Sequence, residues 1–147
     1  MNNKKLKIIN GPNLNLLGTR EPDIYGGTTL AEIENMVKKY VKDNSFAFDL
    51  DFFQSNSEGE IVESLQDAGK NCNGVIINAG GLTHTSVIIL DCLLAINIPK
   101  IEVHISNPFT REEFRHNSYI SKGVNGLICG FGADSYLLAI DAMHKIV

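Results

Sequence analysis

Three polar residues in one long loop carry the groups that proton transfer needs. Asn13, Arg20 and Tyr25 lie in the segment 9–27, which follows a short apolar run and precedes a helical pattern. They supply an amide, a permanent cation and a phenol, and a nearby cation favours the ionised form of a phenol. The combination predicts that Tyr25 acts as a general base. The alternative interpretation is a tyrosine that simply packs within the loop.

A second pair of residues suits a general acid. Glu102 and His104 are two positions apart in an apolar run that reads as a strand, so their side chains project to the same side. A carboxylate in that position orients an imidazole and favours its protonated form. The alternative is a structural histidine at the end of a strand.

Several arginines indicate an anionic ligand. Arg20 and Arg115 are predicted to bind anions, because a guanidinium matches the two-point geometry of a carboxylate. Arg111 lies four positions before Arg115 and would share a helical face with it. For Arg111 the sequence leaves two interpretations open, anion binding or a solvated face that pairs with Glu112 or Glu113. The implied ligand is a small anion bearing hydroxyls.

Metal and nucleotide chemistry have weaker support. His84 is interpreted either as a ligand-binding residue or as a polar residue before a helix that Thr83 or Thr85 caps. His84 and His104 invite a metal, but no carboxylate or thiol stands at a recognisable ligand spacing. The glycines of 130–135 resemble a dinucleotide loop but depart from its pattern at the last position. We therefore predict no metal and no cofactor.

The elements that must position these residues alternate along the chain. Hydrophobic patterning predicts five strands, at 6–9, 46–53, 74–78, 98–106 and 126–129, with helices between them. The run 74–78 is continuously apolar, as in a parallel strand buried on both faces. Thr29, followed by Glu32, predicts the start of the helix after the first loop. This alternation predicts an α/β fold with helices on both faces of a parallel sheet, flavodoxin-like in its strand order 2-1-3-4-5.

In such sheets ligands bind beyond the carboxyl ends of the strands, where the strand order reverses. That rule selects the loops at 10–27, 78–85 and 104–115, which hold most of the polar candidates. The first loop is much longer than a usual strand-to-helix connection, which takes about 2–6 residues. Its four apolar residues are expected to anchor it as a lid: Leu14, Leu16, Leu17 and Ile24.

Length and composition fit one ordinary domain over residues 1–147. The chain is 44% hydrophobic and 20% charged, and its net charge of −4 gives no reason to expect nucleic acid or an acidic membrane as a partner. The three cysteines lie in apolar segments, which predicts buried thiols in a reducing cytoplasm. No signal peptide is expected from the first residues, and the most apolar window, 86–98, is too short to span a bilayer.

Motifs along the whole chain resemble the type II 3-dehydroquinate dehydratase family. The longest reads Ile-Asn-Gly-Pro-Asn-Leu-Asn-Leu-Leu-Gly-Thr-Arg-Glu-Pro-Asp-Ile-Tyr-Gly. The motifs lie in order at 9–26, 53–56, 58–60, 83–86, 102–107 and 111–116. The resemblance implies a flavodoxin-like subunit that converts 3-dehydroquinate to 3-dehydroshikimate without a cofactor, in the shikimate or quinate pathway.

The resemblance also implies roles for the chemical residues. Tyr25 would remove the proton from the carbon next to the ketone. Arg20 would keep the phenol ionised and stabilise the developing charge, and Asn13 would hold the water that stabilises the enolate. His104, oriented by Glu102, would protonate the departing hydroxyl.

The remaining implied roles concern binding and assembly. Five residues would bind the hydroxyls and the carboxylate of the substrate: Asn78, His84, Ile105, Ser106 and Arg115. Asp91 matches the position through which a neighbouring subunit reaches the site. The family assembles as a dodecamer of trimers, so we expect a cytoplasmic homo-oligomer of that kind.

Three positions depart from the family pattern, at Ser57, Ala79 and Leu82. None has a chemical role, so they bear on the packing of the loops and on substrate affinity. Two alternative functions follow from the fold alone. One is a catalytically silent protein that binds a small anion, and the other is a module that binds a nucleotide or flavin. The complete set of Tyr25, Arg20 and His104 favours the enzyme.

Overall fold

All five strands pair in parallel in a single sheet of order β2-β1-β3-β4-β5. The coordinates are a computed structural model, which describes residues 2–147. The strands are β1 (Lys4–Asn10), β2 (Phe48–Gln54), β3 (Gly74–Asn78), β4 (Lys100–His104) and β5 (Gly126–Cys129). The predicted flavodoxin-like order is confirmed, with β1 and β3 at the centre of the reversal.

Two of the strands are displaced or shorter than the sequence predicts. The second begins at Phe48, because Ser45 adopts a positive φ of 55° and the ring of Phe46 stacks on His144 with centroids 4.4 Å apart. The fourth begins after Pro99, since a proline has no N–H to donate to the ladder. The bounds predicted for β3 and β5 are confirmed.

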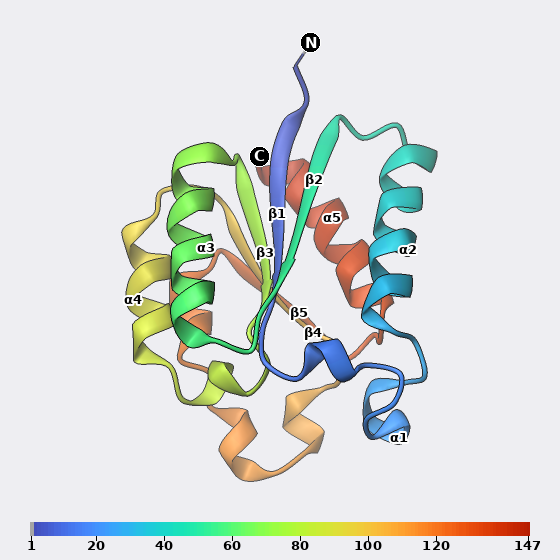
Figure 1. Cartoon of the computed structure of the whole chain (residues 1–147), viewed down its shortest axis with the longest axis vertical. Coiled ribbons are helices and arrows are strands. Elements are labelled where there is room, and N and C mark those ends of the chain that lie inside the picture. The colour runs from blue at the N-terminus through green and yellow to red at the C-terminus, as the bar shows by residue number, and fades with distance from the viewer. Residues whose placement is uncertain (1) are drawn as a thin grey trace.

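Four longer helices cover the two faces of the sheet, as predicted (Figure 1). They are α2 (Leu30–Asp43) and α5 (Asp134–Ile146) on one face, and α3 (Glu58–Asn71) and α4 (Val87–Ala95) on the other. A single turn, α1 (Pro22–Tyr25), interrupts the first loop.

The helix caps follow the sequence only in part. The Thr29 hydroxyl accepts a hydrogen bond from the Glu32 backbone N–H at 3.2 Å, so Thr29 caps α2 as predicted. The cap predicted for α4 is wrong. Neither Thr83 nor Thr85 fills it, because Ser86 Oγ accepts from the Ile89 N–H at 3.0 Å.

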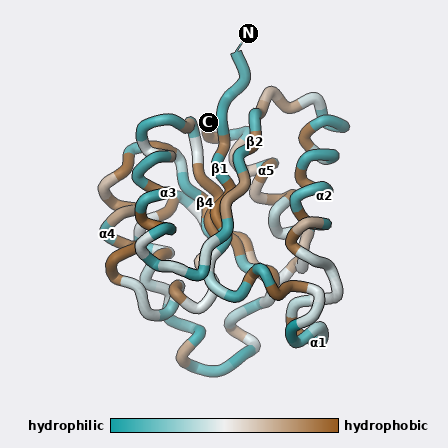
Figure 2. Tube along the Cα trace, viewed as in Figure 1, coloured by the Kyte–Doolittle hydropathy of each residue, from teal (hydrophilic) through white to brown (hydrophobic). Residues whose placement is uncertain are grey.

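Alternate residues of the central strands point to opposite faces of the sheet and pack into two apolar layers. Ile76 faces the core under α2 and α5, whereas Val75 and Ile77 face the core under α3 and α4. All three are fully buried, which accounts for the continuous apolar run of β3. Figure 2 shows this hydrophobic centre along the strands. The rigid sheet fixes the positions of the loops that follow β1, β3 and β4.

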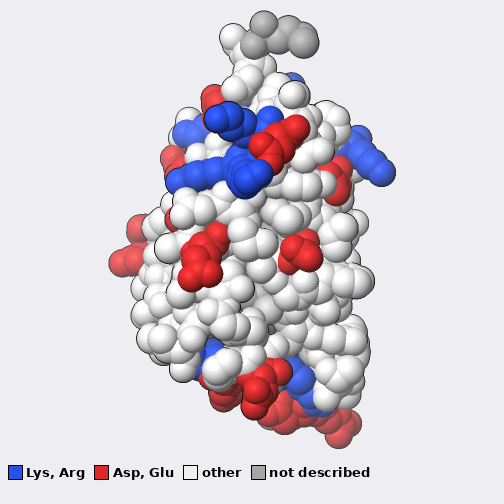
Figure 3. All heavy atoms as spheres, turned by 90° about the vertical axis from the view of Figure 1, so that its right-hand side faces the viewer, with Lys and Arg blue, Asp and Glu red and all other residues white. Residues whose placement is uncertain are grey.

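The surface carries charges of both signs. On the face shown in Figure 3, the largest basic cluster lies toward the end with the N-terminus, and acidic side chains lie beside it, across the middle and, with a few basic ones, at the opposite end. None of the helices within residues 2–147 is long and apolar enough to cross a membrane. All three cysteines are free; Cys72 and Cys92 are buried as predicted, and Cys129 is only partly so.

Candidate active site

A cavity of about 240 Å³ lies at the carboxyl ends of β1, β3 and β4. Nine of the predicted site residues line it: Asn13, Arg20, Tyr25, Asn78, His84, His104, Ile105, Ser106 and Arg115. Glu102 lies beneath this lining and is fully buried. The three loops selected by the strand-order rule therefore converge on this one cavity. We refer to it as the crevice.

Two glycines allow the loops after β1 and β3 to meet. A Cβ on Gly11 would lie 2.5 Å from the carbonyl oxygen of Ala79, closer than real Cβ contacts. Gly80 approaches the other loop in the same way, because its Cβ would lie 2.9 Å from the carbonyl oxygen of Pro12, and its φ is 60°. These close backbone approaches bring Asn13 and Asn78 to the same crevice.

The long first loop has an anchored base and an exposed tip. Leu14 and Leu17 are each 4% exposed and pack into the core, as predicted. The prediction is wrong for Leu16 and Ile24, which are 45% and 40% exposed. Leu16 lies in a 3-10 helix (Leu14–Leu16), whose turn sends successive side chains in different directions. The tip that carries Tyr25 is therefore attached at its base and open to solvent.

Two guanidinium groups lie against the ring of Tyr25. The Cζ of Arg20 is 4.9 Å from the ring centroid, and the Cζ of Arg111 is 5.0 Å away. Arg111 also donates to Ser106 Oγ at 3.3 Å. Both cations therefore lie over the ring of the predicted base. The geometry suits a phenol that serves as a base.

Arg111 lines the crevice and also lies within ion-pair distance of Glu112, so the structure contains features of both interpretations. The partner of Glu112 is Arg115, whose Nε donates to Glu112 Oε2 at 2.6 Å. The corresponding Arg111 contact is 3.9 Å long. Arg115 also lines the crevice, so its predicted role in anion binding stays a prediction.

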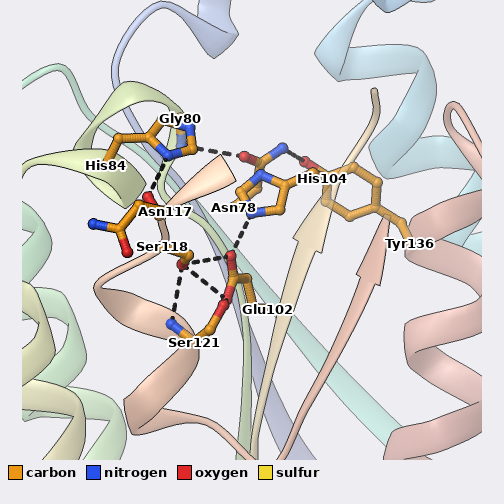
Figure 4. A network of polar contacts seen from close by, with 9 residues as sticks. All are labelled: Asn78, Gly80, His84, Glu102, His104, Asn117, Ser118, Ser121 and Tyr136. Carbon is orange, nitrogen blue, oxygen red and sulfur yellow. Dashed lines mark hydrogen bonds and ion pairs between the residues drawn. The ribbon is translucent and has the colours of Figure 1, made fainter. Parts of the chain in front are cut away.

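His104 and Glu102 form a hydrogen-bonded pair, as their spacing on β4 predicts. His104 Nε2 donates to Glu102 Oε2, and Figure 4 shows this contact between the two side chains. Glu102 also accepts from Ser118 Oγ at 3.2 Å and from Ser121 Oγ. A buried carboxylate with these donors is held in place, and it fixes the imidazole so that Nδ1 remains for the crevice.

The two serines were not found from the sequence. Ser118 and Ser121 stand three apart in a polar connection, and they meet Glu102 because a 3-10 helix (Ile120–Gly123) turns back toward β4. Two hydroxyls at this spacing are a weak signal, since they occur in any polar loop.

His84 is held by a hydrogen bond that its Nδ1 donates, and in the neutral form of the ring this leaves Nε2 free to accept. Its Nδ1 lies 2.9 Å from the carbonyl oxygen of Asn117 (Figure 4). Burial is the main cause that lowers the pKa of His84, so the neutral ring is favoured at neutral pH. A carbonyl accepts only, so Nδ1 carries the proton, and Nε2 is left as an acceptor for a hydroxyl in the crevice.

Two further residues that contact each other behind Asn78 were not predicted from the sequence. The Asn78 side chain donates to the hydroxyl of Tyr136 at 3.0 Å, and that hydroxyl donates to Asn10 Oδ1. Both Tyr136 and Asn10 are 1% exposed. On sequence patterning, a tyrosine on the apolar face of α5 reads only as core.

A second hollow of about 730 Å³ adjoins the crevice across Tyr25 and Arg111. Its lining includes Asp23, Thr28 and Gly132. The smaller crevice is the better candidate site, because it alone of these two hollows is lined by both histidines and by Asn78.

One predicted site residue lies away from the crevice. Asp91 is exposed on α4 and does not contribute to the crevice lining of its own chain. Its role, which depends on a neighbouring subunit, stays a prediction. Within residues 2–147, no group of three or more His, Cys, Asp or Glu side chains converges in a way that could hold a metal ion.

Comparison with known proteins gives consistent matches over nearly the whole chain. The family described as Dehydroquinase class II matches residues 4–144. A 3-dehydroquinate dehydratase of Endomicrobium trichonymphae is 51% identical over 98% of this chain and 99% of its own. One of Prochlorococcus marinus (strain NATL1A) is 50% identical over 94% of each chain. The crystal structure of a type II dehydroquinase from Butyrivibrio crossotus DSM 2876 superposes with a TM-score of 0.92 at 44% identity, covering 96% of this chain and 97% of that one.

Proposed function

The chain belongs to the class II dehydroquinase family, and we infer from this premise how its crevice eliminates water from 3-dehydroquinate to give 3-dehydroshikimate. The activity is that of a hydro-lyase, a 3-dehydroquinate dehydratase of type II, and the shikimate pathway role follows from it. The assignment of steps to residues is our proposal. It rests on the geometry of the crevice.

In the first step Tyr25 acts as the base. Its phenolate oxygen takes a proton from the carbon next to the ketone, and the electron pair of the broken C–H bond moves to the ketone oxygen as an enolate. Arg20 stabilises the charge that develops, and Asn13 holds a water molecule that hydrogen-bonds the enolate oxygen. The supporting observation is the pair of guanidinium groups within about 5 Å of the Tyr25 ring.

In the second step His104 acts as the acid. The enolate collapses to the ketone, the carbon–carbon double bond forms, and the bond to the departing hydroxyl breaks. Protonated His104 donates to that hydroxyl, which leaves as water, and Glu102 stabilises the imidazolium before the transfer. The buried hydrogen bond between the two residues supports this role.

The remaining lining binds the substrate. Arg115 pairs with its carboxylate, and Ile105 and Ser106 contact it at the end of β4. Asn78 and His84 bind its hydroxyls. The neutral state of His84 and its Nδ1 contact with Asn117 support an acceptor role for Nε2.

The observation that carries this account is the placement of a base and an acid around one crevice, Tyr25 with its two cations and His104 with Glu102. The test is turnover of 3-dehydroquinate by the purified chain with no added metal or cofactor, followed by growth of conjugated-enone absorbance. We expect rapid product formation. A folded protein that binds the substrate and forms no product would instead fit the catalytically silent anion binder.

We also propose that residues 1–147 act as one catalytic domain in a cytoplasmic dodecamer built from trimers. Large apolar side chains on α4 support self-association, because Val87, Ile88 and Leu94 are 49%, 57% and 59% exposed. Asp91 lies on the same helix, where a neighbouring subunit would carry it into a crevice. Light scattering of the purified protein gives the subunit number directly, and a monomer at working concentration would contradict this proposal.

A further inference from the structure

A buried tyrosine holds the side chain of Asn78 from behind. Tyr136, in α5, is 1% exposed, and its hydroxyl lies between two asparagines that end adjacent strands. Asn10 ends β1 and Asn78 ends β3, and the two are paired in the sheet register. Tyr136 donates to Asn10 Oδ1. It accepts from Asn78 Nδ2 at 3.0 Å, and Figure 4 shows this second hydrogen bond.

The directions of these hydrogen bonds are fixed by a backbone donor. The Gly80 N–H lies 3.2 Å from the other end of the Asn78 amide. A backbone N–H only donates, so that end is the oxygen, and the end that faces Tyr136 is the nitrogen. The hydroxyl proton of Tyr136 then goes to Asn10. Burial raises the pKa of Tyr136 well above its ordinary value, which keeps that proton in place.

An amide nitrogen carries two N–H groups, and Tyr136 takes one of them. The amide is held at both ends, so the second N–H has a fixed direction, and Asn78 lines the crevice. We propose that Tyr136 is a positioning residue, which locks the Asn78 amide so that its second N–H donates to a substrate oxygen. This proposal rests on the proposed role of Asn78 in substrate binding.

The first test is the variant Tyr136→Phe, which removes one oxygen and keeps the ring. We expect KM for 3-dehydroquinate to rise about tenfold, the size of one misplaced hydrogen bond. We expect kcat to stay within about twofold, because Asn78 binds substrate and transition state alike. The matched control is Tyr40→Phe. It removes a hydroxyl bonded to Asp141 at 2.9 Å, and Tyr40 lines neither the crevice nor the larger hollow, so KM stays unchanged.

A double-mutant cycle separates positioning from a general structural effect. In an Asn78→Ala background, Tyr136→Phe should change KM by less than about twofold, because the amide on which it acts is gone. Equal losses in both backgrounds would overturn the proposal. So would an unchanged KM for Tyr136→Phe in an active enzyme, and that result would leave the proposed function intact. A wild-type chain without turnover would overturn both.

A second variant covers the case in which Tyr136→Phe does not fold. Asn10→Ser shortens the side chain that accepts from the Tyr136 hydroxyl, so that its oxygen no longer reaches that hydroxyl. The aromatic ring stays in the core. We expect a rise in KM in the same direction, which the Asn78→Ala background again removes. Thermal melting of each variant shows that the assayed protein is folded.

Discussion

Replacing Tyr25 by phenylalanine is expected to lower kcat on 3-dehydroquinate by about a thousandfold or more, within the range attributed to a general base. The variant keeps the ring and loses only the oxygen that takes the proton. The contacts of Arg20 and Arg111 with the ring, at 4.9 and 5.0 Å, need no hydroxyl. Substrate affinity should therefore stay within about tenfold of the wild-type value, since one hydrogen bond is the most that binding loses.

Steady-state kinetics and a separate binding titration measure these two quantities. Tyr40→Phe serves as the control, because it removes a phenolic oxygen outside the crevice and the larger hollow. Full activity of Tyr25→Phe would show that the base is another residue. An unchanged kcat with a weakened substrate affinity would show that Tyr25 binds the substrate without taking the proton.

The second large effect is expected for His104→Ala. Without the imidazole, the hydroxyl must depart unprotonated, and we expect kcat to fall by about a hundredfold to a thousandfold. The change also leaves Glu102 buried without its histidine, although Ser118 and Ser121 still donate to it. A lower melting temperature is expected to accompany the loss of rate.

The control for His104→Ala is His144→Ala, whose ring stacks on Phe46 and lines neither the crevice nor the larger hollow. Its rate should match that of the wild type. Since a stability loss alone can lower activity, both variants are compared below their melting transitions. A wild-type rate in folded His104→Ala would remove His104 as the acid.

The sheet was predictable from the sequence because its pattern is local. A continuous apolar run such as 74–78, bounded by turns, fits only a buried strand at that length. The strand-order rule then placed three loops at one end without any long-range information. The pairing of Glu102 with His104 followed from the two-residue period of a strand.

The irregular loops were less predictable, and Arg111 shows why. Four-residue spacing placed it on one face with Arg115 if the segment were helical. The segment forms two separate 3-10 helices instead (Pro108–Thr110 and Glu113–His116), and Arg111 is extended between them with φ of −110°. The break turns Arg111 to the ring of Tyr25 and leaves Arg115 beside Glu112.

The polar contacts of Tyr136 were not predicted from the sequence, for a different reason. Its neighbours on α5 follow a helical apolar pattern, and a buried tyrosine fits that pattern with or without a polar partner. The partners lie 58 and 126 positions away along the chain, so only the fold brings them together. A hydrogen bond over such a separation does not change the local pattern of apolar and polar residues, so that pattern cannot predict it.

The division of labour between Tyr25 and His104 is the central claim, and hydrogen exchange in D₂O tests it most directly. Each variant is incubated with 3-dehydroquinate, and the recovered substrate is analysed for deuterium next to the ketone. His104→Ala should incorporate deuterium faster than it forms product, because Tyr25 still makes the enolate while departure of the hydroxyl is slow. Tyr25→Phe should incorporate none above the uncatalysed background. Exchange at the wild-type rate in Tyr25→Phe, or its absence in folded His104→Ala that binds substrate, would contradict the assignment of base and acid.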